Sequence, residues 1–287
     1  MHEEKNQLVN YCNQLINFGY GISYPPFGHH DLHTHSQCEI FCVIRGNGHY
    51  ITEGSRHKFE PGRIFLMRPG ELHMADMVND IPREAFTFHF DPSVIDGFDP
   101  ERKLLSPFFD RPFGLNNIYD RPVVSQTEIY TLFQKMRTLG KDNYDSCIHG
   151  TALLIAVLGE LKRLFDAKLY TRSENNVKIM HGIIDYVNQH LTAELTPEHL
   201  CEKFHISRAQ LDRNFKHTTG STVWAYITAK RLLLAKNYIS EGMHATEAST
   251  VCGFKDYSTF YRAYRRHFGQ APTTPEALRH KIFLNSR

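Results

Sequence analysis

The C-terminal part of the chain contains the same pattern twice, and this repeat constrains the fold more than any other feature of the sequence. Residues 195–216, and the segment that ends at 253–269, each predict a short helix, a tight turn and a second helix rich in arginine and small polar residues. A second helix of that composition fits the major groove of DNA, where its N-terminal half can reach base edges. The repeat therefore predicts an all-α C-terminal domain with two helix-turn-helix units that bind double-stranded DNA.

Apolar periodicity and capping signals place the helices of this domain. Apolar residues at helical spacing predict a helix over 175–191 and a longer one over 222–240, which would connect the two units rigidly. Residues with short polar side chains precede several of the expected helices and can cap them. These signals are Thr196 before Pro197, the capping-box spacing from Ser207 to Gln210, and Asp256 ahead of the second reading helix.

Length and charge favour a second, separate domain. The chain has 287 residues, 41% of them hydrophobic, which is enough for two ordinary cores. Residues 1–172 carry 18 Lys and Arg against 21 Asp and Glu, whereas residues 173–287 carry 15 against 10. A polar stretch at 171–176 marks the linker. We therefore expect domains at 1–172 and 173–287, of which only the basic C-terminal one faces DNA phosphates.

Cysteine usage and hydropathy predict a cytoplasmic protein. None of the six cysteines belongs to a CxxC pair or to a spacing typical of a zinc site, so we expect buried thiols in a reducing compartment. The N-terminus lacks the apolar stretch of a signal peptide, and no run approaches the roughly 20 apolar residues of a membrane span.

The N-terminal part changes from helical to strand patterns along its length. Apolar residues in 4–18 have helical spacing and predict a short opening helix. From about 31 to 92, short alternating or apolar runs separated by glycine turns predict an antiparallel barrel or sandwich. The expected strands are residues 39–45, 49–52, 63–67 and 85–90.

Two helices are expected after the strands, at about 126–139 and 145–167. The second carries a narrow apolar stripe with helical spacing. Such a stripe packs on its own domain or forms a coiled-coil-like seam between two copies of the chain. The stripe consists of Leu154, Leu158, Leu161 and Phe165.

Three motifs of the C-terminal domain together resemble the signature of the AraC-type transcriptional regulators. They read Arg231-Leu-Leu-Leu-Ala235, Gly253-Phe254-x-Asp256-x-Ser258-x-Phe260-x-Arg262 and Phe268-Gly269-x-x-Pro272. The resemblance covers residues 175–280 and implies a seven-helix domain that sets two reading helices in successive major grooves. Those grooves lie about 34 Å apart on one face of the DNA. It also implies contact with RNA polymerase and activation rather than repression.

The resemblance assigns roles to individual residues of the two reading helices. Arg213 and Arg262 are the best candidates for bidentate contacts with guanine, and Ala209 can touch only a thymine methyl group. The phenylalanines of the motifs are spaced as residues of the hydrophobic core, so we expect them to be buried. The implied base-reading residues are Ala209, Asp212, Arg213, Tyr257, Ser258, Tyr261 and Arg262, and the implied phosphate contacts are Arg208, Lys216, Arg265 and Arg266.

The chain departs from the family pattern at two places. Ala245, Ala248 and Ser249 stand where large aliphatic residues are usual, which predicts either a looser second unit or larger partners around them. Pro275-Glu276 replaces the usual Tyr-Arg, so the terminal helix is expected to begin late.

A second resemblance lies in the N-terminal domain, which is similar to cupin barrels. His33-Thr-His35-Ser-Gln-Cys-Glu39 matches the first cupin motif well, and Pro69-Gly70-Glu-Leu-His73 is a degenerate second motif. On one continuous strand, residues 33, 35 and 39 would share a face. The resemblance therefore predicts an all-β, cupin-like barrel with His33, His35, Glu39 and His73 converging in its lumen.

These four residues admit three interpretations. They can bind a small effector such as a sugar in a pocket with aromatic walls, hold a divalent metal, or have a structural role only. The effector interpretation needs no cofactor. The metal interpretation would use His33, His35, Glu39 and His73 as ligands, and the candidate walls are Phe41, Phe86, Phe88 and Phe90.

Together these features predict a ligand-responsive regulator that is not an enzyme and forms a homodimer through the 145–167 helix. The competing functions are a metal-dependent cupin sensor or enzyme with an accessory DNA-binding domain, and a constitutive DNA-binding protein with a purely structural barrel.

Overall fold

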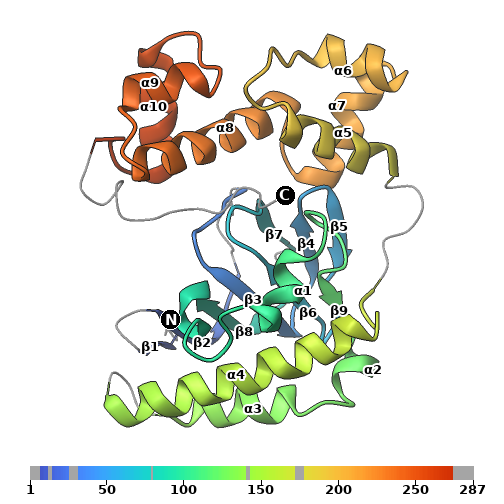
Figure 1. Cartoon of the computed structure of the whole chain (residues 1–287). Coiled ribbons are helices and arrows are strands. Elements are labelled where there is room, and N and C mark those ends of the chain that lie inside the picture. Colours follow the sequence, from blue (N-terminus) through green and yellow to red (C-terminus); the bar gives the residue numbers. More distant parts are fainter. Residues whose placement is uncertain are drawn as a thin grey trace.

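The computed structural model describes residues 7–11, 15–25, 32–78, 80–139, 143–171 and 178–273. Two antiparallel sheets form a barrel with helices on its outer face, and an all-helical C-terminal domain is docked against one end of the barrel (Figure 1). The two-domain fold class predicted from the sequence is confirmed. The boundary predicted at 172/173 lies outside the described residues.

The larger sheet has six strands in the order β1-β2-β8-β3-β6-β9, and the smaller has three in the order β5-β4-β7. All pairings are antiparallel. The four strands expected from alternation are present as β3, β4, β6 and β8. The strands are β1 (Gln7–Tyr11), β2 (Ile16–Ser23), β3 (Cys38–Arg45), β4 (Gly48–Thr52), β5 (Ser55–Lys58), β6 (Ile64–Met67), β7 (His73–Met77), β8 (Arg83–Phe90) and β9 (Ile118–Tyr119).

The helix predicted over 4–18 is wrong, because this segment contributes β1 and β2. These strands pair with each other, and β2 also pairs with β8 along its whole length. Ile16 and Phe18 of β2 are buried against the helices of the domain. Long-range pairing therefore overrides the helical spacing of a few apolar residues.

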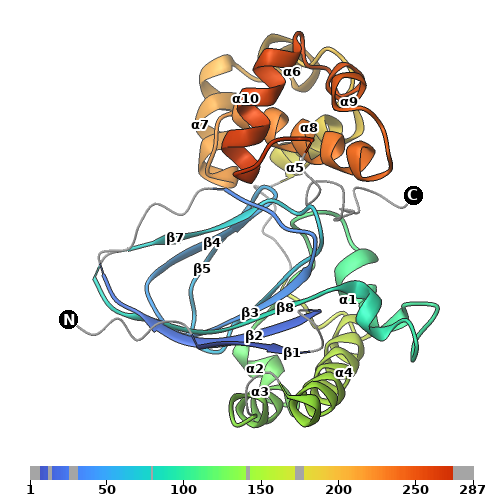
Figure 2. The same cartoon turned by 90° about the vertical axis from the view of Figure 1, so that its left-hand side faces the viewer.

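The outer face of the larger sheet is covered by helices, of which α3 and α4 lie beneath it in Figure 2. Leu154, Leu158 and Leu161 of α4 are fully buried in this layer, so the apolar stripe of α4 packs on its own domain. Short 3₁₀ turns at Pro92–Ile95 and Lys103–Leu105 precede the helices. The helices are α1 (Ser106–Phe109), α2 (Arg121–Val124), α3 (Ile129–Arg137) and α4 (Tyr144–Asp166).

Most of the described cysteines are thiols, but one is not. Cys38, Cys42 and Cys252 are free and buried, and Cys201 is free and partly exposed. Cys147 of α4 forms a disulfide, so the prediction of reduced thiols is wrong for this residue. A disulfide depends on which side chains the fold brings together, and sequence spacing does not show that. Among the described residues, no helix is long and apolar enough to cross a membrane.

The C-terminal domain consists of two helix-turn-helix units that share α8. Every capping signal identified in the sequence is present: Thr196 accepts from His199 N, Ser207 forms a capping box with Gln210, and Asp256 accepts from Thr259 N. The seventh helix of the family, with Pro275 and Glu276, lies outside the described residues. The helices are α5 (Lys178–Gln189), α6 (Pro197–Phe204), α7 (Arg208–Thr219), α8 (Val223–Ser240), α9 (Ala245–Val251) and α10 (Tyr257–Phe268).

The small residues of α9 are buried and lie beside large aromatic ones. Ala248 is fully buried in the core of the second unit, as are Phe260 and Tyr264 of α10. Aromatic side chains thus occupy the space that larger aliphatic residues on α9 would fill.

Candidate DNA-reading helices and effector site

The two candidate reading helices, α7 and α10, have well-defined starts and ends. Both begin at a side-chain N-cap and end at a glycine with positive φ, Gly220 at 74° and Gly269 at 71°. Glycine adopts this left-handed conformation without steric cost, and it terminates the helix. The N-terminal turns that would enter the groove are therefore fixed in position.

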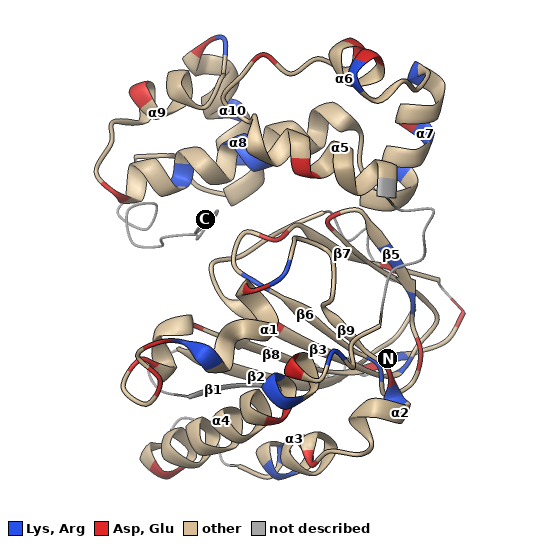
Figure 3. Ribbon diagram, turned by 45° about the vertical axis from the view of Figure 1, so that its right-hand side comes forward, with Lys and Arg blue, Asp and Glu red and all other residues tan. Residues whose placement is uncertain are grey.

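Figure 1 shows α7 and α10 at opposite ends of α8, and the view in Figure 2 places both on the same side of it. Both helices carry basic residues, which are blue on the ribbon of Figure 3: Arg208, Arg213 and Lys216 on α7, and Arg262, Arg265 and Arg266 on α10. Two helices that enter successive turns of one groove must lie on the same side of the domain, and α7 and α10 meet that condition.

Most of the predicted base-reading residues are accessible. Arg213 and Arg262 are exposed, whereas Phe215 and Phe260 are buried core residues, as their spacing predicts. Of the remaining base-reading candidates, Ala209, Asp212 and Ser258 are exposed, and Tyr257 and Tyr261 are half-buried. The predicted phosphate contacts Arg208, Lys216, Arg265 and Arg266 are all exposed.

Arg208 and Asp212 are already paired with each other in the free chain. Arg208 Nε donates to Asp212 Oδ2 at 2.9 Å, and Arg208 Nη1 donates to Glu198 Oε1 at 2.5 Å. Both contacts are exposed and therefore weak. Phosphates of DNA can displace them, which would also free Asp212 to accept from a base.

In the barrel, three imidazoles surround one carboxylate oxygen. Glu39 Oε2 lies 2.9 Å from His35 Nε2, 3.1 Å from His73 Nε2 and 3.4 Å from His89 Nε2. The side chains of Glu39 and His73 are buried, but those of His35 and His89 are 22% and 23% exposed. We call these four residues the Glu39 cluster; it is accessible to solvent through two of its histidines.

Backbone carbonyls fix the orientation of two of the rings. His35 Nδ1 lies 2.8 Å from Gln37 O, and His73 Nδ1 lies 2.8 Å from Glu71 O. Because a carbonyl only accepts, each Nδ1 must carry a proton and donate it. In a neutral ring, Nε2 then presents a lone pair to Glu39 Oε2, which is also an acceptor. The cluster therefore requires an additional proton or a cation between these atoms.

The pKa values of Glu39 and His73 are shifted in the direction that favours positive charge beside the Glu39 carboxylate. Burial raises the pKa of Glu39, but interactions with the three imidazoles outweigh it and hold the pKa well below the usual value. Burial lowers the pKa of His35. Burial also lowers the pKa of His73, and the contacts with Glu39 raise it by more.

The structure brings together three of the four residues predicted for this site and adds one. His35, Glu39 and His73 converge, and the ring of His33 packs edge-on against that of His73 with centroids 4.4 Å apart. His89 was missed by sequence reasoning, although it is the cross-strand partner of Glu39. The donor atoms of His35, Glu39 and His89 lie within 4.8 Å of one another, close enough to share one ion.

The expectation that residues 33, 35 and 39 share one strand is wrong. Strand β3 begins at Cys38, so only Glu39 lies on it, and His33 is held by an isolated bridge to His73. His35 reaches Glu39 by folding back over the intervening bend. Side-chain parity along a strand therefore does not explain the convergence.

The aromatic walls differ from the expected set. Phe41 lines the barrel interior with Tyr50 and Phe65, and Tyr50 Oη donates to Glu39 Oε1 at 3.3 Å. Phe86, Phe88 and Phe90 instead face the outer helices; Phe86, for example, packs on Phe133 of α3. Since successive residues of β8 alternate between faces, His89 points inward and Phe88 outward.

Comparisons with known proteins identify both domains. A model described as an AraC-like ligand binding domain matches residues 19–139, and a helix-turn-helix domain model matches residues 200–276. The chain belongs to the AraC-type transcriptional regulators. It is a ligand-responsive, sequence-specific DNA-binding regulator with a cupin-like N-terminal domain.

Relatives of this regulator match either most of its length or about a third of it. It is 25% identical over 254 residues to the HTH-type transcriptional activator RhaS of Salmonella typhimurium, with 86% of each chain covered. Among solved structures, it is similar to ToxT from Vibrio cholerae, with 11% identity, 90% of this chain and 96% of that chain covered, and a TM-score of 0.38. A probable AraC family regulator from Rhodopseudomonas palustris is 27% identical over 36% of this chain and 98% of its own, with a TM-score of 0.33.

Proposed function

We propose that the chain activates transcription when a small, hydroxyl-rich effector such as a sugar binds beside Glu39. The observation that carries this proposal is the partly open Glu39 cluster, which combines one buried carboxylate with three imidazoles at an aromatic-lined part of the barrel. Carboxylates and imidazoles exchange hydrogen bonds with hydroxyl groups, and aromatic faces pack on the apolar faces of sugar rings.

We infer the sign of regulation and the remaining partners from the likeness to the family. Activation is supported by the description of RhaS as a transcriptional activator. An activator of this kind contacts RNA polymerase and works in the cytoplasm. It requires no cofactor, and the Glu39 cluster serves as a sensor rather than as a catalytic centre.

A divalent metal is the second candidate occupant of the Glu39 cluster. The supporting observation is that the Nδ1 atoms of His35 and His73 donate to backbone carbonyls. This is the usual outer contact of metal-ligating histidines, because it aims the Nε2 lone pair at the ion. His35, Glu39 and His89 would be the ligands, with His73 Nε2 directed at the same carboxylate oxygen.

One thermal-shift experiment distinguishes these occupants. A ligand at a hundred times its Kd stabilises the folded chain by about 2.7 kcal/mol, which raises Tm by several degrees. We expect one member of a panel of mono- and disaccharides to raise the Tm of the full chain, and Glu39→Ala to abolish the shift. Glu128→Ala, which changes an exposed carboxylate on the far side of the sheet, should leave it intact.

The other outcomes of the panel are equally informative. A shift with Zn²⁺ or Co²⁺ alone, lost in Glu39→Ala, would replace the sugar with a metal as occupant. A sugar shift that survives in Glu39→Ala would place the effector elsewhere, and a flat response to sugars and metals would reject both occupants.

We also propose that α4 mediates a homodimer, through a face other than the buried leucine stripe. Tyr144 and Ile148 are 78% and 51% exposed, and Ala152, one turn further along, is also exposed. A dimer would pair two DNA-binding domains on repeated sites. Ile148→Lys is expected to convert the dimer into a monomer in sedimentation equilibrium, whereas Lys135→Ala on α3 should not. A wild-type chain that is itself monomeric at micromolar concentration would reject the interface.

A further inference from the structure

The barrel and the DNA-binding domain are joined by a buried ion pair. Glu53 lies in the turn between β4 and β5, and its Oε1 accepts from Lys230 Nζ of α8. Its Oε2 accepts from Tyr226 Oη, also of α8. The side chains of Glu53 and Lys230 are 0% and 1% exposed. A buried pair of charges holds its two elements in one geometry, because neither charge tolerates the loss of its partner.

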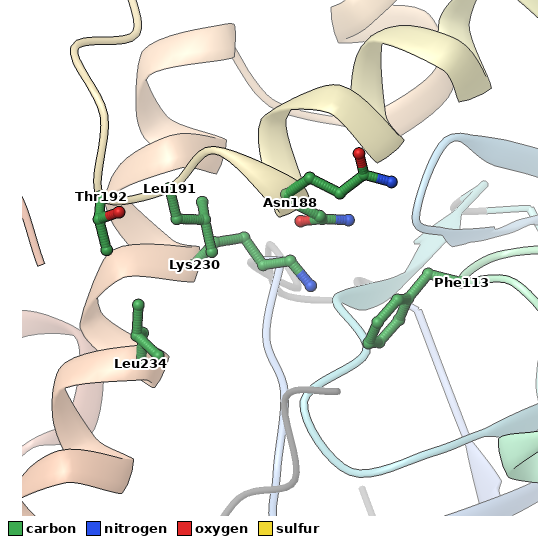
Figure 4. A pocket seen from close by; sticks show the side chains of 7 residues that line it. Phe113, Asn188, Leu191, Thr192, Lys230 and Leu234 are labelled. Carbon is green, nitrogen blue, oxygen red and sulfur yellow. The ribbon is translucent and has the colours of Figure 1, made fainter. Parts of the chain in front are cut away.

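Further contacts complete the environment of Lys230. Its Nζ donates to Gly70 O at 3.3 Å and lies 4.3 Å from the ring centroid of Phe113. Figure 4 shows the Lys230 side chain extending from α8 toward Phe113 of the barrel, beside Asn188 and Leu191. Together with Glu53, the ammonium group therefore has partners from three separate loops of the barrel domain.

The backbone at Glu53 has a conformation that side chains rarely adopt. Its φ is +34°, in the left-handed region, and it is followed by Gly54 at +90°. A Cβ at Gly54 would lie within 2.1 Å of Ile184 Cδ1 on α5, so the turn fits closely against the first helix-turn-helix unit. A non-glycine residue remains in such a conformation only where surrounding contacts over-determine it.

Glu53 is also connected to the Glu39 cluster through one residue. Leu72 N donates to Glu53 Oε1 at 3.1 Å, and Glu53 N donates to Leu72 O at 3.0 Å. His73, the next residue, directs its imidazole at Glu39. Both polar backbone groups of Leu72 are therefore held by Glu53, which links the segment with His73 to the ion pair.

Leu72 and α8 connect this segment of the barrel to the cores of the two reading units. Leu72 is fully buried within the core of the first unit, although it belongs to the barrel. Tyr226 of α8 packs in the same core, whereas Leu232 and Ile239, further along α8, pack in the core of the second unit. The position of α8 therefore sets the relative placement of α7 and α10.

We propose that Glu53 and Lys230 are positioning residues that couple occupancy of the Glu39 cluster to the position of α8. This coupling rests on the proposed function in that the cluster is the sensor. It specifies a route, from Glu39 through His73, Leu72 and Glu53 to Lys230, by which a ligand that favours one arrangement of His73 shifts the population of α8 positions.

Amide hydrogen exchange of the full chain tests the coupling without an effector or an operator. Glu39→Gln removes the negative charge that attracts His73, and it should change exchange in α8 at least threefold in the wild-type background. In the Lys230→Met background, the same substitution should leave α8 exchange unchanged. Lys230→Met and Glu53→Gln should each by themselves accelerate α8 exchange at least tenfold, since each leaves a charge without its partner.

Two controls separate coupling from general loss of structure. Asp76→Asn breaks the Arg56–Asp76 pair on the same small sheet and should not affect α8 exchange. Helix α4 serves as an internal reference; if Lys230→Met also accelerates exchange there, the shape-preserving Glu53→Gln replaces it as the background. The coupling is overturned if Glu39→Gln leaves wild-type α8 exchange unchanged, or changes it equally in both backgrounds. A flat sugar panel would reject the effector but would not alter this result.

Discussion

Replacing Arg111 with methionine is expected to destabilise the barrel by about 3–5 kcal/mol, because it leaves the Glu71 carboxylate buried without its cation. Arg111 Nη1 donates to Glu71 Oε1 at 2.8 Å and Nη2 donates to Oε2 at 2.7 Å, and both side chains are fully buried. The N–H groups of Gly114 and Arg68 donate to the same carboxylate at 2.6 and 3.0 Å. Urea unfolding of the full chain, followed through the barrel transition, measures the loss.

The same pair predicts how stability depends on pH. Burial raises the pKa of Glu71, but the charge and hydrogen bonds of Arg111 outweigh it and lower the pKa to about 2 from its ordinary value of 4.5. Because the folded-state pKa lies below that of the unfolded chain, the stabilisation is complete above about pH 4.5 and is lost as pH falls toward 2. At 1.36 kcal/mol per pKa unit, it amounts to about 3 kcal/mol.

Two variants isolate this contribution. Glu71→Gln should remove it from the stability profile between pH 4.5 and 2. Arg163→Met breaks an exposed pair with Glu160 and should cost less than about 1 kcal/mol. A loss below 1 kcal/mol in Arg111→Met, or an unaltered profile in Glu71→Gln, would contradict the assigned role.

Glu71 also gives the degenerate second cupin motif a structural role. It stands between Gly70, whose carbonyl accepts from Lys230, and His73, whose Nδ1 donates to the carbonyl of Glu71 itself. The ion pair with Arg111 therefore fixes a segment that contacts both the Glu39 cluster and α8. Stability and signal transmission depend on the same loop.

Local signals predicted the helical domain better than the barrel. Caps such as Thr196 and Ser207 act within one turn of helix, so they can be identified in the sequence without knowledge of the fold. Strand β2 depends on β8, with Phe18 opposite Phe88, and that pairing has no local signature. The spacing of apolar residues near the N-terminus therefore predicts a helix where the chain forms β1 and β2.

In the candidate site, too, residues that depend on long-range pairing cannot be identified from the sequence alone. His35, Glu39 and His73 stand in recognisable motifs, whereas His89 is identified only by its register opposite Glu39. Glu53 and Lys230 lie 177 residues apart in sequence. Singly, a glutamate in a hairpin turn and a lysine on a helix are expected on the solvated surface. Only the docking of the two domains shows that they are buried together.

Arg213→Ala and Arg262→Ala are each expected to weaken binding to the preferred DNA site by about 1–3 kcal/mol, roughly ten- to a hundredfold. Both side chains are exposed on the reading helices, and an arginine gains most of its base discrimination from a bidentate contact with guanine. The site can be selected from a random DNA pool with the wild-type chain. Each substitution should then relax base preference at one position, and the two positions should lie about one helical turn apart.

Lys216→Ala and Arg266→Ala provide the matched comparison, because both residues are predicted to contact phosphates. Loss of a phosphate contact weakens binding to all sequences nearly equally and reduces the salt dependence of binding by about one ion. If Arg213→Ala and Arg262→Ala behave in this way too, the two arginines position the protein on DNA without reading it. Base recognition would then rest on the remaining candidates, above all on Asp212, which is held by Arg208 in the free chain.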